Sequence, residues 1–324
     1  MINLTTKNKF KSIFIWILKV LLAQFILINI SAAFHAHRLT HFYDEDRVRN
    51  IKPSAGTLFL RTWRLMVGRK YPKSLIQYYP PGIYDTVQLT TKKGIKIEGW
   101  LMKADSSIGT VILIHGLNNN KGFVLNEAYE FISLGYNTLL IDARAHGNSN
   151  GNTNSIGSKE DEEVKLAFDL IKSKGENNII LWGMSMGAVM ITKAIHEYNL
   201  APQKIILEMP FASLQDHLRA RARVLGFPDE PFGFFVTLWA GIEQGYWGFG
   251  HKTTRYVKSI HCPVLLQWGA RDAYVLINET ESIFKNIGTN KKSLIMYDEA
   301  GHQSLLGTDS EKWKNSVNNF LQSN

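Results

Sequence analysis

Apolar and polar positions alternate along most of the chain in blocks that predict strands and helices in turn. Residues 85–90 and 95–102 show strand-like alternation around a Lys93-Gly94 turn and predict an antiparallel pair. Beyond them, short apolar runs alternate with segments of helical spacing. The predicted strands are residues 111–114, 136–141, 178–182, 204–207, 264–268 and 294–297, and the predicted helices are residues 124–134, 160–174, 187–196, 277–287 and 311–321. This order predicts an α/β protein with a mostly parallel central sheet and helices on both faces.

Two local features refine this pattern. Ser158, followed three residues later by Asp161, is expected to cap the helix predicted over residues 160–174. The alternation stops between Pro210 and Lys258, in a segment that begins with arginines and continues into aromatic-rich stretches. Because this segment lies between two predicted strands, it is an insertion and not a separate domain. We expect residues 210–258 to form a helical lid over the site, and helices that only pack against the body are the alternative.

The amino-terminal region contains an apolar run from Ile13 to Phe34, which has the length of a membrane span, about 20 residues. A cleaved signal peptide is the alternative, because Ser31-Ala32-Ala33 resembles a cleavage site, although such peptides usually have an apolar core of only ~7–15 residues. We expect an uncleaved transmembrane anchor at residues 13–34 after a cytoplasmic tail at residues 1–12. Lysines before the run favour this orientation, with the rest of the chain on the extracytoplasmic (periplasmic) side, whereas basic residues after the run favour the reverse.

Positive charge is concentrated beyond this run. The 324-residue chain has a formal net charge of +9, and no acidic residue occurs between positions 47 and 73. The basic residues there are Arg47, Arg49, Lys52, Arg61, Arg64, Arg69, Lys70 and Lys73, and the apolar residues that would share one side of a helix are Leu58, Phe59, Trp63, Met66 and Val67. We expect residues 35–84 to be a basic amphipathic segment that contacts anionic membrane lipid. An ordinary helix packed on the catalytic domain is the alternative, and no nucleic acid is expected to bind.

Histidine and cysteine give no strong metal signal. His35, His37 and His41 are expected in an interfacial loop, because no further dedicated ligands accompany them. Cys262 is the single cysteine, which excludes an intrachain disulfide and a thiolate zinc cluster. We expect it to be a partly buried thiol at the start of a strand.

The pattern Gly-x-Ser-x-Gly occurs twice, at residues 147–151 and 183–187. Only the second copy lies between a predicted strand and a predicted helix, the order that a nucleophile elbow requires. In such an elbow the serine backbone is strained, which costs on the order of 1–3 kcal/mol, and the flanking glycines avoid clashes. Ser185 is therefore the candidate nucleophile, and Ser149, in a segment of loop composition, is expected to be a turn residue.

Two further polar residues fall at the carboxyl ends of predicted strands, where active sites of open α/β sheets form. Asp272 follows the strand predicted at 264–268, and His302 follows the last predicted strand. Ser, Asp and then His is the chain order of the α/β-hydrolase triad. Glu208 also ends a predicted strand and is the alternative to Asp272 as the residue that orients His302.

From about Asp85 to the C-terminus the chain resembles an α/β-hydrolase, in particular the serine aminopeptidase and monoglyceride-lipase-like branch with its membrane-anchored bacterial members. Besides the triad, the motifs that carry the resemblance are His115-Gly116, Asp142-x-Arg144-x-His146-Gly147-x-Ser149 and Gly269-x-x-Asp272. One departure is Ala145, where many relatives carry glycine. The resemblance implies a catalytic domain with the α/β-hydrolase fold at residues 85–324.

The mechanism that the resemblance implies is acyl transfer to water. His302 would take the proton of Ser185 as the hydroxyl attacks a carbonyl, and Asp272 would fix the imidazole tautomer. By position, the backbone N–H groups of Leu117 and Met186 would form the oxyanion hole. His115 is expected to be a structural residue of that turn and not a second base.

Together these features predict a membrane-anchored serine hydrolase that cleaves an ester with an acyl or other apolar group and uses no metal or other cofactor. An amidase or peptidase, an acyltransferase, and a non-catalytic binding protein on the same fold are the alternatives. The expected partners are a small-molecule ester or acyl substrate and membrane lipid, and the sequence does not specify the oligomeric state.

Overall fold

An eight-stranded sheet with the order β1-β2-β4-β3-β5-β6-β7-β8 forms the centre of the protein. The computed structural model describes residues 4–43 and 57–323. The strands are β1 (Asp85–Thr90), β2 (Lys96–Met102), β3 (Thr110–Ile114), β4 (Asn137–Ile141), β5 (Ile179–Met184), β6 (Lys204–Glu208), β7 (Val264–Gly269) and β8 (Lys292–Tyr297). β2 pairs antiparallel with β1 and β4, and every other pairing in the sheet is parallel. The predicted mostly parallel sheet is confirmed.

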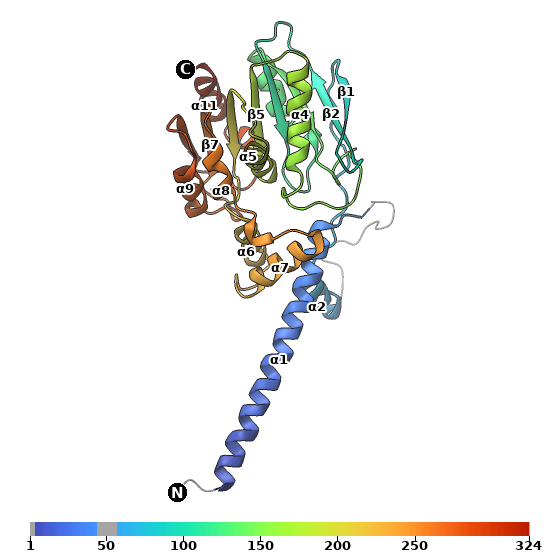
Figure 1. The fold of residues 1–324 in the computed structure, drawn as a ribbon, viewed down its shortest axis with the longest axis vertical. Helices are drawn as coiled ribbons and strands as arrows, with labels where there is room; N and C mark the ends of the chain where they lie inside the picture. Colours follow the sequence, from blue (N-terminus) through green and yellow to red (C-terminus); the bar gives the residue numbers. More distant parts are fainter. Residues whose placement is uncertain (1–3, 44–56, 324) are drawn as a thin grey trace.

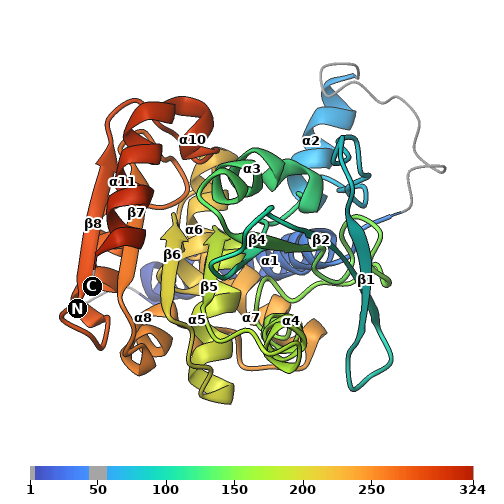
Figure 2. The same ribbon diagram turned by 90° about the horizontal axis from the view of Figure 1, so that it is seen from above.

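Helices cover both faces of the sheet (Figure 2). One face carries α3 (Leu125–Ser133), α10 (Leu305–Thr308) and α11 (Ser310–Gln322), and the other carries α4 (Asp161–Ser173), α5 (Met186–Tyr198), α8 (Thr253–Tyr256) and α9 (Ile277–Asn286). Single-turn 3-10 helices lie at Lys121–Val124, Gly248–Gly250 and Val257–Ser259. Each face has its own apolar cluster, and all residues of β3 and β5 are buried between the two clusters. This burial on both faces explains why the central strands read as continuous apolar runs.

The predicted cap of α4 is wrong. Its N-cap residue is Glu160, two positions beyond Ser158. The buried Glu160 carboxylate accepts hydrogen bonds from the backbone N–H groups of Ser155, Gly157 and Lys159. An acidic side chain that receives three such donors holds the loop before α4 more firmly than a serine hydroxyl could.

The insertion between β6 and β7 is helical, as predicted. It contains α6 (Leu214–Val224) and α7 (Phe232–Gln244), which lie below the sheet in Figure 1, next to α1 (Leu4–Thr40). The carboxyl-terminal part of α1 packs against α7, and its amino-terminal part extends away from the body of the protein. The insertion therefore lies between the sheet and the long apolar helix (Figure 1).

The expected interfacial loop at His35 and His37 is wrong, because α1 continues to Thr40. Ala32, Ala36 and Leu39, spaced along one side of the helix, are buried in the core cluster that also contains residues of α7. This packing keeps the segment helical beyond the apolar run. His41 follows the helix and forms an isolated bridge with Thr153.

α2 (Leu58–Val67) is the helix predicted in the basic segment. It lies beside α1, where Ser31 Oγ donates to the Met66 carbonyl at 2.6 Å. Much of its apolar side is exposed, since Phe59 is 74% and Trp63 is 52% exposed, whereas Val67 is buried. The predicted lipid-contacting residues Arg47, Arg49 and Lys52 lie outside the described residues.

Candidate active site

Ser185 lies on the sharp turn between β5 and α5. Its backbone has φ 53° and ψ −117°, a sparsely populated conformation that stores strain. A Cβ atom at Gly183 would lie 2.7 Å from the carbonyl carbon of Gly187, and one at Gly187 would overlap the carbonyl oxygen of Ile114. Both glycines are therefore required by close backbone approach, as expected of a nucleophile elbow.

The structure brings Ser185, His302 and Asp272 together at the carboxyl ends of their strands. His302 Nε2 lies 2.8 Å from Ser185 Oγ, and His302 Nδ1 lies 2.6 Å from Asp272 Oδ2. Asp272 Oδ1 accepts the backbone N–H groups of Tyr274 and Val275 at 2.7 and 2.9 Å. This series has the geometry of a nucleophile, a base and a carboxylate that orients the base.

Glu208, the alternative acid, has different partners. Its Oε1 accepts the indole N–H groups of Trp182 at 3.0 Å and Trp313 at 2.6 Å. Burial, together with the nearby Glu127 carboxylate, raises the pKa of Glu208 to about 8. Glu208 is thus a buried structural acid, and Asp272 is the carboxylate that contacts His302.

The two expected oxyanion donors belong to segments next to Ser185. The Leu117 N–H makes no hydrogen bond to another residue in the described part of the chain, and Leu117 lines the same cavity as Ser185 and His302. Met186 begins α5, and N–H groups in the first turn of a helix have no acceptor within that helix. This arrangement can place two backbone donors beside a carbonyl bound at Ser185.

The turn at residues 115–118 is held by the loop that follows β4. His115 Nε2 accepts the Ala143 N–H at 3.0 Å, and His146 Nε2 accepts the Asn118 N–H at 3.2 Å. Burial lowers the pKa of His115 to about 4 and that of His146 to about 3, so both rings are neutral at pH 7. These contacts give His115 a structural position in the turn, and His146 is a supporting residue whose role the sequence does not reveal.

Ser149 is part of this loop and not of the Ser185 site. Its Oγ donates to the Asp142 carbonyl at 2.8 Å and accepts the Glu98 N–H at 2.9 Å. Ala145 has φ 64°, a left-handed conformation that glycine adopts without steric cost. Ala145 therefore keeps the left-handed backbone conformation that a glycine would adopt at this position.

The cavity at Ser185, of about 240 Å³, is also lined by residues that the sequence reasoning did not single out as site residues. His217 and Arg221 come from α6 of the insertion, and Tyr274 follows Asp272. The arginines of the insertion are visible in the sequence, but nothing in their spacing tells which one faces the site.

One group of side chains has the arrangement of possible metal ligands. His37, His41 and Glu243 have ligand atoms within 4.8 Å of one another, the single such group found in the described residues. The group lies where α1 meets α7, with His37 Nδ1 3.4 Å from Glu243 Oε2. None of its members lines the cavity at Ser185.

The order of the parallel strands, the elbow between β5 and α5, and the polar residues at the strand ends define the fold class: the protein has the α/β-hydrolase fold. Within this class, residues 105–228 match the sequence model of the family described as serine aminopeptidase, S33.

Similar proteins include lipases and esterases. Uncharacterized protein YqkD of Bacillus subtilis (strain 168) is 27% identical over 237 residues, which are 70% of this chain and 76% of that protein. Lysophosphatidylserine lipase ABHD12 of Gallus gallus is 26% identical over 231 residues, and the chain covers 58% of the length of that lipase. The esterase Pf2001 of Pyrococcus furiosus superposes with a TM-score of 0.64 at 25% identity, over 79% of this chain and 98% of the esterase.

Proposed function

We propose that this α/β-hydrolase is a membrane-anchored serine hydrolase that cleaves an ester bond in an acyl or other apolar substrate. The observation that carries the proposal is the hydrogen-bonded series of Ser185, His302 and Asp272 on a strained elbow. The lipase and esterase names among the similar proteins support an ester as the substrate bond.

In the proposed reaction, Ser185 Oγ attacks the ester carbonyl while His302 Nε2 takes the hydroxyl proton. Asp272 holds the Nδ1–H of His302, so that Nε2 is the free base, and stabilises the imidazolium that forms. The N–H groups of Leu117 and Met186 stabilise the oxyanion of the tetrahedral intermediate. His302 then gives its proton to the leaving alcohol, and water activated by the same imidazole releases the acid.

The length and packing of α1 support anchorage by this helix. The chain from Asn8 to Thr40 is the one segment of the described residues that is long and apolar enough to cross a membrane. α1 has 37 residues and is about 55 Å long, which exceeds the ~30 Å of a bilayer core. Its first part can therefore span the membrane while its last turns pack on α7, next to the exposed apolar side chains of α2.

Turnover of a graded substrate panel tests the ester assignment. We expect the full-length protein in detergent to hydrolyse p-nitrophenyl esters, with longer acyl chains preferred over acetyl, and Ser185→Ala to lose this activity. A preference for acetyl over every longer chain would contradict an apolar acyl pocket. Faster cleavage of aminoacyl amides would favour the peptidase alternative, and ester exchange with an added alcohol would identify an acyltransferase.

We further propose that the catalytic domain lies on the extracytoplasmic side of the membrane, on the basis of the lysines before the apolar run. Fusions of two reporters to the C-terminus test this orientation. An alkaline phosphatase, active only outside the cytoplasm, is expected to be active, and a fusion active only with a cytoplasm-dependent reporter would reverse the assignment.

A further inference from the structure

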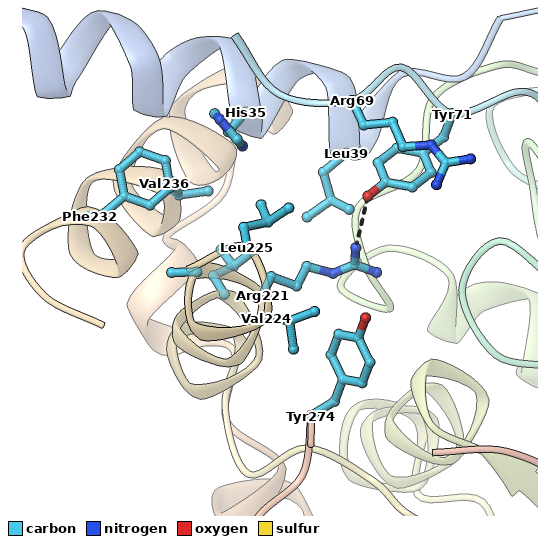
Figure 3. A pocket seen from close by; sticks show the side chains of 12 residues that line it. His35, Leu39, Arg69, Tyr71, Arg221, Val224, Leu225, Phe232, Val236 and Tyr274 are labelled. Carbon is cyan, nitrogen blue, oxygen red and sulfur yellow. Dashed lines mark hydrogen bonds between the residues drawn. The ribbon is translucent and has the colours of Figure 1, made fainter. Parts of the chain in front are cut away.

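Two neighbouring cavities share Arg221 and Tyr274 as lining residues. The first lies over Ser185, and the second is enclosed by the end of α1, by α6 and α7, and by the segment at Arg69 and Tyr71 (Figure 3). The second has apolar walls that include Leu39 and Val236. Among the described residues, no aspartate or glutamate lines either cavity. A substrate bound at Ser185 would therefore meet apolar surface and positive charge together.

Arg221 is held at this junction without a neutralising partner. Its Nη1 donates to Tyr71 Oη at 3.4 Å, and its guanidinium carbon lies 5.9 Å and 6.0 Å from the ring centres of Tyr71 and Tyr274. Within the described residues no carboxylate lies within 4.0 Å of it, although Arg219 and Arg223 on the same helix pair with Glu230 and Asp229. The charge at Arg221 is thus available to a ligand.

The neighbouring His217 adds a neutral donor. Its Nε2 accepts the Arg221 Nε–H at 3.0 Å, so the ring proton resides on Nδ1. His217 is 3% exposed, and its Nδ1 has no hydrogen-bond partner among the described residues. Burial and the charge of Arg221 hold the pKa of His217 well below its ordinary value. This leaves a buried N–H without an acceptor among the described residues, an unfavourable arrangement that a bound acceptor group would relieve.

We propose that Arg221 and His217 form an anion-binding subsite beside Ser185, and that the ester substrate carries a phosphate or carboxylate group. This inference rests on the proposed hydrolase function. The remaining guanidinium N–H groups of Arg221 hold two anionic oxygens in the fork geometry that such groups fit. The apolar part of the substrate extends along the cavity between α1 and α7.

Matched pairs of neutral and anionic esters test the subsite in the full-length protein in non-ionic detergent. One pair is p-nitrophenyl valerate and p-nitrophenyl hemiglutarate, and the other is 1-decanoylglycerol and its 3-phosphate. We expect Arg221→Gln to lower kcat/KM for the preferred anionic ester at least about tenfold, since hydrogen bonds to charged groups are the stronger ones. The neutral ester of the same pair is expected to change less than about threefold, and Arg221→Lys to restore part of the preference.

Arg219→Gln is the matched control, because Arg219 lies on the same helix but pairs with Glu230 and lines neither cavity. If the anionic ester is preferred only in the decanoylglycerol pair, the anion is a phosphate. If it is preferred only in the valerate and hemiglutarate pair, the anion is a carboxylate. Equal losses on neutral and anionic esters in Arg221→Gln, or no charge preference in the wild type, would overturn the subsite and leave the hydrolase proposal intact.

If no ester is turned over, a binding measurement tests the anion-binding subsite separately from the proposed hydrolase function. Decyl phosphate is titrated into Ser185→Ala with and without Arg221→Gln, and decyl glucoside serves as the neutral ligand. The subsite predicts tighter binding of the phosphate, weakened at least about tenfold by Arg221→Gln. Equal affinities for the two ligands in Ser185→Ala would overturn the subsite without reliance on the Arg221 variant.

Discussion

Asp272 and Glu208 are two carboxylates at the ends of neighbouring strands, and their partners separate their roles. Asp272 receives two backbone N–H groups and the imidazole of His302. Glu208 receives two indole N–H groups inside the core, and burial raises its pKa to about 8. Chain position alone left both residues as candidates, because only the packing of Trp182 and Trp313 shows which carboxylate the core encloses.

At the residue scale, we expect Asp272→Asn to lower kcat for ester hydrolysis by about 10³–10⁴-fold, because the imidazole loses the partner that fixes its tautomer. Glu208→Gln is expected to stay within severalfold of the wild type, since its amide oxygen can still accept both indole N–H groups. Steady-state kinetics on refolding-competent, spectroscopically matched variants measures both. Activity retained in Asp272→Asn and abolished in Glu208→Gln would assign the acid to Glu208.

Glu208 also predicts a pH dependence of stability. Its folded-state pKa of about 8 lies above the ordinary value of 4.5, so the folded protein keeps a proton that the unfolded chain loses. Wild-type stability should therefore fall as pH rises through this window, by up to about 1.4 kcal/mol per pH unit from this group. The thermal midpoint of Glu208→Gln should gain on that of the wild type from pH 5 to pH 8. If the difference in thermal midpoint between Glu208→Gln and the wild type did not change with pH, Glu208 would not hold a proton in the folded protein.

At the scale of elements, the sheet and the strand ends that carry the site are predictable from sequence, and the lid contacts are not. β3, β5 and β7 are buried on both faces, so their apolar runs mark the strands, and Ser185 and the two candidate acids, Asp272 and Glu208, follow from their places at strand ends. His217 and Arg221 come from an inserted helix whose rotation over the strand ends is set by packing against α7 and the 3-10 helix Gly248–Gly250. The spacing of residues within α6 carries no information about that rotation.

The β5–α5 elbow predicts that alanine substitution at two glycines has very different effects on stability. Gly187→Ala forces a Cβ atom onto the Ile114 carbonyl, whereas a Cβ at Gly82 would have no atom within 4 Å and no positive φ. We expect Gly187→Ala to lower the free energy of unfolding by at least about 1–3 kcal/mol, as overpacking does, and Gly82→Ala to stay within about 0.5 kcal/mol. Thermal or denaturant unfolding compares the two. Equal stabilities would show that the elbow does not need the close approach described.

At the scale of the whole molecule, α1 joins the apolar amino-terminal segment to the catalytic body without interruption (Figure 1). The three residues that resemble a signal-peptidase site, Ser31 to Ala33, lie within this helix, and Ala32 is fully buried in the core cluster that includes α7. Cleavage there would remove part of the surface on which α7 and α2 rest. This packing favours an anchor over a cleaved signal.

We therefore expect the protein isolated from membranes to retain its amino-terminal residues and to resist extraction by alkaline carbonate. Mass spectrometry of the amino-terminal peptide and fractionation of the intact chain measure the two properties. As a control, a variant with three arginines in place of Leu21, Leu22 and Phe25 should lose membrane association, because each charge at the centre of a span costs about 2.5–3.5 kcal/mol. A mature protein that begins near Phe34 would contradict the anchor.

Covalent labelling with a fluorophosphonate probe tests whether Ser185 is a nucleophile activated by His302. We expect stoichiometric labelling of the folded full-length protein at Ser185, lost in Ser185→Ala, strongly slowed in His302→Gln and unchanged in Ser149→Ala. A folded wild-type protein that remains unlabelled, or labelling that persists in Ser185→Ala, would contradict it.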